Sequence, residues 1–254
     1  MPSIIPIPAF ADNYIWSLRE GSHVAVVDPG DAAPVIAYLD REQLDLCAIL
    51  ATHHHGDHVG GIRDLVTRWN VPVYGPAHET IPARTQALGE GDSIVVPRLG
   101  LALSVRDIPG HTSGHIAFVG EGKLFCGDTL FASGCGRLFE GTPSQMLASL
   151  DKLAALPPAT EVYCGHEYTL SNLRFAAAVE PGSVAVHQRQ NREQAKRSRG
   201  LPTLPSMISE ELITNPFLRV REPVVRAAAE RHAGRTLDSA VAVFAELRAW
   251  KNSF

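Results

Sequence analysis

The segment Thr52-His53-His54-His55-Gly56-Asp57-His58 is the part of this chain from which its architecture can be inferred. It follows the apolar run 46–50, and a short apolar run that ends at a turn signal is typical of a buried strand. The histidines therefore stand at a strand end and open into a loop, where functional residues are concentrated. Because alternate side chains of an extended segment point the same way, His53 and His55 can converge on one metal ion. The last two residues can turn toward a second metal.

A run of histidines can also be a purification tag or a metal-scavenging tract. Tags stand at chain ends, whereas this run lies inside the chain, before an expected helix over residues 60–69. Gly56 and Asp57 also interrupt the run in a defined order. We therefore interpret the segment as a metal site, since imidazole nitrogens and carboxylate oxygens bind zinc and iron.

The composition is that of a globular protein of 254 residues, enough for one large domain or for one domain with an appendage. Hydrophobic residues make up 45% of the chain and charged residues 20%, which allows a full core. The net charge of −4 and the pI of about 6.2 argue against a nucleic-acid partner, whose binding domains are basic. We interpret the basic stretch Arg189–Arg199 as a solvated helix face.

A cytoplasmic protein without a membrane partner is expected. No apolar stretch approaches the roughly 18 to 20 residues that span a bilayer, and the first residues lack a signal-peptide pattern. The four cysteines are scattered and contain no C-x-x-C pair, so thiols in a reducing compartment are expected. A ligand role for Cys126, Cys135 or Cys164 is disfavoured, because enough histidine and aspartate is available.

Strand and helix patterns alternate in the first two-thirds of the chain. Strands are expected at residues 24–27, 46–50, 71–74, 101–108, 116–119, 123–126 and 161–164, and helices at 34–39, 60–69 and 146–156. From about Thr169 the strand patterns disappear, and helices are expected at 170–179, 183–198, 223–232 and 237–251. The sequence thus predicts an α/β domain followed by an all-helical segment.

Three further strand ends carry a glycine next to a histidine or an aspartate. They supply His111 and His115, then Asp128, then His166. Seven of the eleven histidines lie at these strand ends or in the first segment, which a random scatter of histidines would not produce. We therefore expect the four segments to meet at one site.

The ligands divide into two sets. One metal takes His53, His55 and His111, a second takes Asp57, His58 and His166, and Asp128 bridges the two. Three protein ligands per metal and a shared carboxylate leave room for water, which a catalytic site needs. We expect a hydroxide that bridges the metals, held by Asp57 and Asp128, to be the nucleophile.

Three residues near the ligands have other expected roles. Alternation points His54 away from its neighbours and toward packing. His115 is expected to support the site rather than to bind metal. Asp28, in Asp-Pro-Gly, either orients a ligand or is a plain turn carboxylate, and the sequence leaves both readings open.

These residues resemble the metallo-β-lactamase superfamily, whose H-x-H-x-D-H signature is matched by residues 52–58. Five more segments resemble glyoxalase II, the hydroxyacylglutathione hydrolases: Asp12-Asn13-Tyr14, Gly134–Thr142, Gly165–Thr169, Asn215–Arg219 and Phe244–Phe254. The resemblance covers nearly the whole chain. It implies an αββα metallo-β-lactamase-type sandwich over residues 1–168, followed by a C-terminal all-helical, substrate-binding domain over residues 169–254.

The resemblance also implies an activity. Members hydrolyse S-D-lactoylglutathione and other hydroxyacylglutathiones to D-lactate and glutathione, in methylglyoxal detoxification. Two divalent metal ions are expected, zinc first, with iron or manganese as alternatives, in a monomeric enzyme. The residues that the resemblance places against the glutathione thioester are Arg137, Phe139, His166, Tyr168, Arg219 and Arg221. Two departures bear on these contacts: Pro223 stands where a lysine is expected, and Leu138 replaces an aromatic residue.

Other functions compete with this one. A mononuclear iron dioxygenase acting on glutathione persulfide, also of this superfamily, would need fewer ligands than the chain offers. A non-catalytic metal-binding protein would not need every ligand intact. A β-lactamase or a nuclease fits the basic contacts and the helical tail less well. The absence of G-x-S-x-G argues against an α/β-hydrolase.

Overall fold

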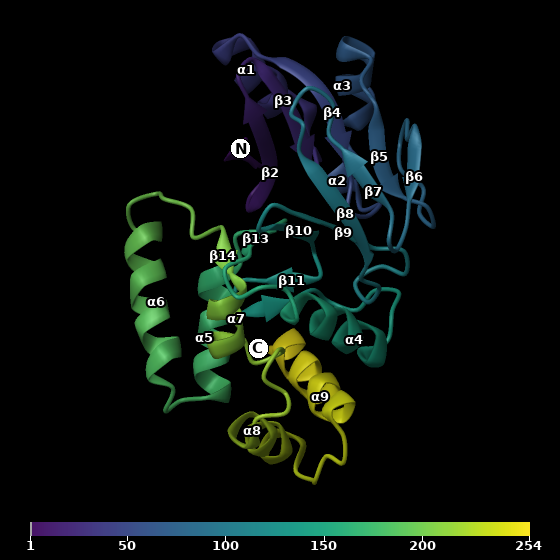
Figure 1. The fold of residues 1–254 in the computed structure, drawn as a ribbon. Helices are drawn as coiled ribbons and strands as arrows, with labels where there is room; N and C mark the ends of the chain where they lie inside the picture. Colours follow the sequence, from purple (N-terminus) through teal and green to yellow (C-terminus); the bar gives the residue numbers. More distant parts are fainter. Residues whose placement is uncertain (1) are drawn as a thin grey trace. The chain divides into compact units, whose positions relative to one another are not determined.

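The computed structural model describes residues 2–254, which divide into two compact units (Figure 1). The first unit comprises the residues up to Asp107 together with Thr112–Gly127. The second comprises Ile108–His111 and Asp128–Phe254. The class is α/β with mixed sheets and a helical C-terminal region, as the sequence predicted. Among the described residues, no helix is long and apolar enough to cross a membrane.

The first sheet lies entirely in the first unit. Its strands, in spatial order, are β1 (Ser3–Ala9), β2 (Asn13–Glu20), β3 (His23–Val27), β4 (Asp45–Leu50), β5 (Val73–Pro76) and β6 (Gln86–Leu88). The first three pair antiparallel and the rest parallel. Sequence analysis missed β1, because Pro6 and Pro8 lack the donors that a central strand needs; β1 is an edge strand, where proline is tolerated.

A second group of strands in the first unit is antiparallel. It contains β7 (Ser93–Val95), β8 (Ala102–Asp107), β9 (Ile116–Gly120) and β10 (Lys123–Gly127). The strands expected at residues 116–119 and 123–126 are confirmed as β9 and β10, which pair antiparallel as a hairpin. Glu121 and Gly122 both have positive φ, 49° and 73°, the conformation that a two-residue turn requires to match strand twist.

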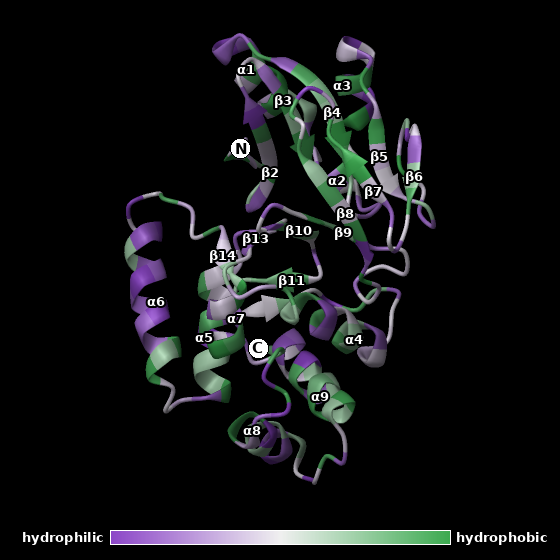
Figure 2. Ribbon diagram, in the orientation of Figure 1, coloured by the Kyte–Doolittle hydropathy of each residue, from purple (hydrophilic) through white to green (hydrophobic). Residues whose placement is uncertain are grey.

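Three helices belong to the first unit: α1 (Ala32–Glu42), α2 (Gly56–Val59) and α3 (Ile62–Trp69). The predicted helix over 60–69 is thus interrupted at Gly60–Gly61 and preceded by one turn. Val35 and Leu39 of α1 pack with Ile62 and Leu65 of α3 in one core cluster that includes residues of β3 and β4. Figure 2 shows β3 and β4 largely in the hydrophobic colour, as expected of buried parallel strands.

The second unit is mainly helical. Its elements are β11 (Leu130–Phe131), β12 (Gly134–Cys135), α4 (Pro143–Ala154), β13 (Glu161–Cys164), α5 (Thr169–Val179), α6 (Val184–Arg197), β14 (Ser206–Met207), α7 (Ile208–Thr214), α8 (Pro223–Ala233) and α9 (Ala240–Ser253). Helix α4 begins three residues before the predicted start, because Thr142 and Gln145 form a capping box. The short strand β14, paired with β13, was not expected in the tail.

Helix α6 is charged, as predicted, and its middle is drawn in the hydrophilic colour in Figure 2. The interpretation of Arg189–Arg199 as a solvated face is nevertheless wrong for its first residue. Arg189 is 2% exposed, and Glu193 is buried as well. Charged side chains are rarely buried unless they are paired, so this part of α6 needs partners.

Candidate metal centre

The loop between β4 and α2 is held close to the turn after β3 by two glycines. A Cβ at Gly60 would lie 2.6 Å from the carbonyl oxygen of Gly30, and a Cβ at Gly61 2.4 Å from the backbone nitrogen of Ala32. Both obstacles are backbone atoms, so only glycine fits. The sequence Gly60-Gly61 after the histidine motif therefore packs α2 against the 28–32 turn and positions the histidines.

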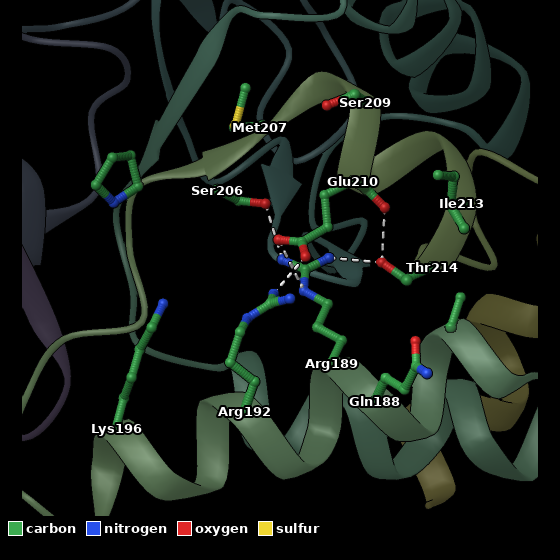
Figure 3. A pocket seen from close by; sticks show the side chains of 12 residues that line it. Gln188, Arg189, Arg192, Lys196, Ser206, Met207, Ser209, Glu210, Ile213 and Thr214 are labelled. Carbon is green, nitrogen blue, oxygen red and sulfur yellow. Dashed lines mark hydrogen bonds and ion pairs between the residues drawn. The ribbon is translucent and has the colours of Figure 1, made fainter.

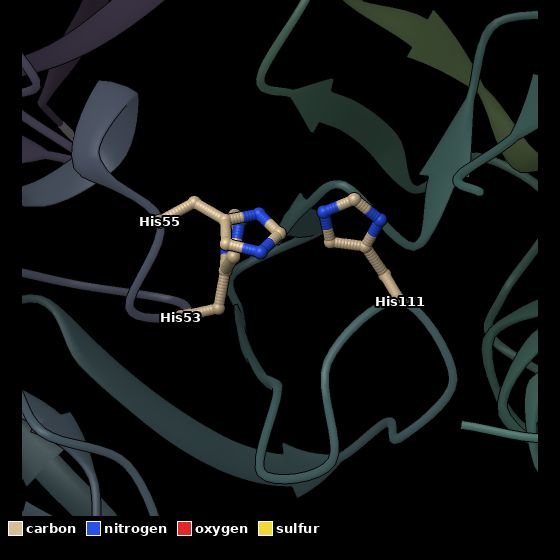
Figure 4. Close-up of side chains that lie close together, drawn as sticks. All are labelled: His53, His55 and His111. Carbon is tan, nitrogen blue, oxygen red and sulfur yellow. The ribbon is translucent and has the colours of Figure 1, made fainter. Parts of the chain in front are cut away.

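His53 and His55 bring two ring nitrogens together. The Nε2 atom of His53 lies 3.2 Å from Nδ1 of His55, and the rings meet edge to face. Figure 4 shows both on the loop after β4, with His111 on a different loop, the one after β8. His53 is fully buried, and His55 is half-buried. This is the convergence that alternation in an extended segment predicted.

Asp28 and Thr52 determine which nitrogen of two histidines is available. The Thr52 backbone N–H and hydroxyl both donate to the Asp28 carboxylate, at 2.7 Å each. Since its hydrogen is used, the hydroxyl accepts from Nδ1 of His53, at 3.1 Å. His58 donates from Nδ1 to Asp28, at 3.0 Å. Both histidines therefore present an Nε2 lone pair, and of the two readings of Asp28, the structure supports the one in which it orients a ligand.

Asn13 supports the remaining ligand of this loop. Its side-chain amide donates to Oδ2 of Asp57 at 3.0 Å. The same Oδ2 atom lies 3.6 Å from Nε2 of His58. Sequence analysis used Asn13 only as part of a family motif; its contact with Asp57 spans 44 residues, and no local pattern could reveal it.

Glu79 is a second supporting residue that sequence analysis missed. This buried carboxylate lies 2.9 Å from Nδ1 of His54 and accepts hydrogen bonds from the Thr112 hydroxyl at 2.5 Å and the Gly114 N–H at 3.1 Å. It therefore links the histidine loop to the loop before β9. His115, on that second loop, is fully buried and stacks on the ring of His53.

The second unit brings two further predicted ligands, His111 and His166, together around a third, Asp128. Its Oδ2 atom lies 3.5 Å from Nε2 of His111 and 3.2 Å from Nε2 of His166. His111 uses Nδ1 against the Arg137 carbonyl oxygen at 2.9 Å, so its Nε2 lone pair is also available. The ring of His166 stacks on that of Tyr168, with centroids 4.7 Å apart.

The spacing of these atoms fits a metal. Two ligands of one tetrahedral zinc ion, each about 2.0–2.2 Å from the metal, are separated by about 3.3–3.6 Å. The four pairs within the units, His53–His55, His58–Asp57, His111–Asp128 and His166–Asp128, are separated by 3.2 to 3.6 Å. Imidazole nitrogen and carboxylate oxygen are also the donors that zinc, iron and manganese accept. The residues present therefore fit divalent metal ions.

The cysteines do not join this set. Burial raises the pKa of the Cys135 thiol to about 11, and burial raises the pKa of Cys164 as well. In the part of the chain that the structure describes, the groups of side chains that could hold a metal ion contain no cysteine. Among the described residues the four cysteines are buried and form no disulfide.

Two groups of cations lie in the second unit. Arg219 pairs bidentately with buried Glu180, at 3.0 Å for both bonds, and Arg221 pairs with Asp151. Lys251 of α9 forms a different group: burial, and then the cations Arg248, Arg174 and Arg137, lower its pKa to about 8. A cluster of like charges is a site for an anion. Sequence analysis quoted the segment Phe244–Phe254 but assigned no role within it.

Comparisons with known proteins cover both parts of the chain. Residues 12–166 match the family model of the metallo-beta-lactamase superfamily, and residues 167–254 match that of the hydroxyacylglutathione hydrolase C-terminus. A protein of Alkalilimnicola ehrlichii named hydroxyacylglutathione hydrolase is 61% identical, with 99% of each chain covered. One of Nitrosomonas europaea with the same name is 52% identical, over 100% of this chain and 97% of its own length.

Solved structures show the same fold. The B3 metallo-beta-lactamase BLEG-1 superposes with a TM-score of 0.63 at 26% identity, over 86% of this chain and 99% of its own. The di-iron-bound form of TTHA1623 gives a TM-score of 0.59 at 27% identity, over 86% of this chain and 100% of its own. ETHE1 from Myxococcus xanthus, at 22% identity and a TM-score of 0.65, shows likeness of fold alone.

Proposed function

This chain belongs to the hydroxyacylglutathione hydrolase family of the metallo-β-lactamase superfamily, and we propose that it hydrolyses S-D-lactoylglutathione and other hydroxyacylglutathiones to the hydroxy acid and glutathione, as a step of methylglyoxal detoxification. The observation that carries this proposal is the agreement between the full-length relatives and the four ligand pairs at metal-ligand spacing. A fold alone would not assign an activity, whereas a complete donor set does support one.

The ligand assignment is part of the proposal. His53, His55 and His111 would hold one metal, and Asp57, His58 and His166 would hold the second. Asp128 is the carboxylate that the two sets would share. The support is chemical: each set contains at least two imidazole nitrogens, and Asp128 already lies between two histidines from separate loops. Zinc is the expected metal, and the same donors accept iron or manganese.

When bound, two such metals lower the pKa of a water toward neutrality and polarise the thioester carbonyl. The chain's own residues prepare the site for that chemistry. Asp28 and Thr52 hold His58 and His53 in the tautomer whose Nε2 carries the lone pair. Asn13 fixes the Asp57 carboxylate by donating to it. These contacts leave the ligands little reorganisation to undergo on metal binding.

Glutathione is an anion, and the second unit offers cations for its carboxylates. We propose that the cluster of Lys251 with Arg248, Arg174 and Arg137 is the main contact for these carboxylates. Burial and the neighbouring cations make a bound anion beside Lys251 favourable. Arg219 and Arg221 remain proposed contacts, although each is already paired with a carboxylate. Phe139, Tyr168 and His166 are proposed to contact the thioester; Phe139 is 63% exposed and lies edge-on to His111.

The domain division is proposed as catalytic residues 1–168 and substrate-binding residues 169–254, close to the boundary between the two family models. A cytoplasmic location is proposed from the four buried thiols. We also propose a monomer, which light scattering on the purified protein would test.

The test is metal analysis together with a thioester assay on the purified protein. We expect two metals per chain, and equal amounts of free thiol and D-lactate released from S-D-lactoylglutathione. The glutathione persulfide dioxygenase reading is not favoured by the relatives. One iron per chain, oxygen uptake with glutathione persulfide and no thioester hydrolysis would replace our proposal with that one.

A further inference from the structure

A pocket of about 560 Å³ lies between α6, β14 and α7 in the second unit (Figure 3). Figure 3 shows the Arg189 side chain extending from its helix toward Glu210 and Thr214. Arg192 and Lys196 line the pocket too, but their cationic groups pair with Glu193 and Glu210. Carboxylates therefore compensate the cations of the pocket. The structural importance of the pocket lies in the contacts that buried Arg189 makes.

Arg189, which lines the pocket, forms an ion pair with Glu211 of α7. The guanidinium Nη2 lies 2.8 Å from Oε1 of Glu211, whose side chain is fully buried. Arg189 also donates to the hydroxyls of Thr214 at 2.6 Å and Ser206 at 2.8 Å. Glu211 thus compensates the buried charge of Arg189, and removing one partner would leave the other charge buried and unpaired.

This ion pair is hydrogen-bonded to the turn between β11 and β12. The other carboxylate oxygen of Glu211 accepts the Ser133 N–H at 2.7 Å, and Arg189 donates to the Ser133 hydroxyl at 3.1 Å. Ser133 has a φ of 53°, a left-handed conformation that a serine adopts at some cost. The bonds from α6 and α7 offset this cost and hold the turn in its strained shape.

Two asparagines also form hydrogen bonds to this hairpin. Asn215 donates to the carbonyl oxygens of Phe131 and Gly134, at 3.2 and 2.9 Å, and its amide also donates to Glu211 at 2.9 Å. Asn172 donates to the Ala132 carbonyl at 3.0 Å. Strands of two residues have little stability of their own, so the position of this hairpin is set by these external bonds.

In the sequence, this hairpin lies between two residues of the proposed site. Asp128 stands two residues before β11, and Arg137 stands two residues after β12. Movement of the turn therefore moves the Asp128 carboxylate away from His111 and His166, and moves the Arg137 carbonyl that fixes the His111 tautomer. Both consequences fall on ligands rather than on the tail itself.

We propose that Glu211, through its bond to the Ser133 N–H, is a positioning residue for Asp128. The helical tail then has a second role besides holding substrate: it determines the metal affinity of the catalytic site. This inference rests on the proposed metal role of Asp128. It predicts that weakening a contact in α7 loosens a carboxylate that is 83 residues away in sequence, without touching substrate.

The test compares two neighbouring glutamates of α7. Glu211→Gln weakens the bonds to the hairpin. The single carbonyl oxygen of an amide cannot accept from Ser133 and Asn215 on one side and from Arg189 on the other. Glu210→Gln is the matched control, since the Glu210 carboxylate pairs with Arg189 and Arg192 of α6 rather than with the hairpin. We expect Glu211→Gln to speed hydrogen exchange at the Ser133 amide about 10- to 150-fold, the range for hydrogen bonds to charged groups. The control should stay within about twofold of wild type.

Metal binding gives the second readout. In titrations of the metal-free protein with Zn²⁺, Glu211→Gln should weaken the second binding event by about 10- to 100-fold and lower kcat, with KM little changed. Unchanged Zn²⁺ binding despite faster exchange at Ser133 would overturn the proposal. So would unchanged exchange.

A double variant covers the case in which Glu211→Gln does not fold. Arg189→Met/Glu211→Met replaces the ion pair by apolar side chains, a change that buried pairs often tolerate. If it folds with wild-type Zn²⁺ binding, the proposal is overturned; if it folds and loses the second Zn²⁺, the proposal stands. If the wild type binds two Zn²⁺ ions but does not hydrolyse the thioester, the proposed function fails while this test still decides the role of Glu211.

Discussion

Oδ2 of Asp28 lies 3.0 Å from Nδ1 of His58 and also accepts the Thr52 hydroxyl, so one carboxylate sets the tautomer of two histidines, directly and through Thr52. Asp28 is held there in the left-handed region, with a φ of 53°. Aspartate tolerates this conformation better than most residues. A strained backbone at a site residue indicates that the surrounding contacts require it.

Asp28→Ala should therefore weaken metal binding. We expect a loss of about 10- to 100-fold in affinity, the usual effect of removing a carboxylate behind a ligand histidine. Asp31→Ala is the control: Asp31 caps α1 through the Ala33 N–H, so its loss should lower the free energy of unfolding by about 0.5–2 kcal/mol and leave the metals in place. Equal metal affinity in Asp28→Ala and wild type would show that His58 needs no orientation.

Asp128→Ala tests the two-metal assignment. The change removes the oxygen that lies 3.2 Å from His166 Nε2 and 3.5 Å from His111 Nε2. We expect the metal content to fall below two per chain and kcat to fall by roughly 100-fold or more, because metal stabilisation of the reacting group is worth several kcal/mol. Exposed Asp64→Ala, on α3, should change neither. Strong chelators should abolish the wild-type activity, and added metal should restore it; full activity with one metal would refute the assignment.

The pKa of Lys251 predicts a pH dependence. Because its pKa is lowered to about 8, the ammonium loses its charge as the pH rises through 8, and KM for S-D-lactoylglutathione should rise there. Lys251→Arg keeps the charge and should flatten that rise, so the difference between the two profiles isolates this group. Identical KM profiles from pH 7 to pH 9.5 would remove Lys251 from the binding site.

The same shift makes a separate prediction for stability. Between about pH 8 and the ordinary lysine value of 10.5, the unfolded chain binds more protons at Lys251 than the folded chain does. The free energy of unfolding should therefore gain a contribution that grows with pH across this window. Denaturant titrations at pH 7.5 and pH 10 measure this contribution. Between these two pH values, the free energy of unfolding should rise more for the wild type than for Lys251→Met.

Sequence patterns predicted the parts of this protein that depend on neighbours in the chain. The strand before His53, the two strands that flank Glu121-Gly122 and the start of α8 at Pro223 all follow from local rules. The grouping of His111 with Asp128 and His166 could also be predicted, because strand ends gather at one edge of a sheet.

Contacts between distant segments could not be predicted in this way. Asn13 reaches Asp57 across 44 residues, and Glu211 reaches Ser133 across 78. Arg189 was misread for the same reason: its helix is polar in sequence, and only the fold supplies the carboxylate that lets it be buried. The bonds from Glu211 and Arg189 to Ser133 join the segment after Asp128 to the helical tail, in agreement with the division of the compact units within the catalytic sequence.

The glutathione contacts can be decided by comparing Arg219 with Lys251. Arg219→Ala would be ambiguous, because it also leaves buried Glu180 without its bidentate partner. The double variant Arg219→Gln/Glu180→Gln removes both charges and keeps a neutral hydrogen-bonding pair, so it isolates the substrate role. If Arg219 binds a glutathione carboxylate, KM should rise about 10- to 150-fold with kcat little changed, since such a contact serves ground and transition states alike.

Lys251→Ala is expected to give that KM increase instead. Lys251 is surrounded by cations, so a carboxylate placed beside it relieves repulsion as well as forming a bond. The exposed Arg226 of α8 pairs with Glu230 at 3.3 Å and donates to the Leu237 carbonyl oxygen. It serves as the control, and Arg226→Ala should leave KM unchanged. A larger KM increase in the Arg219/Glu180 double variant than in Lys251→Ala would show that Arg219 binds the glutathione carboxylates. Lys251 would then only support α9 through its bonds to Ser171.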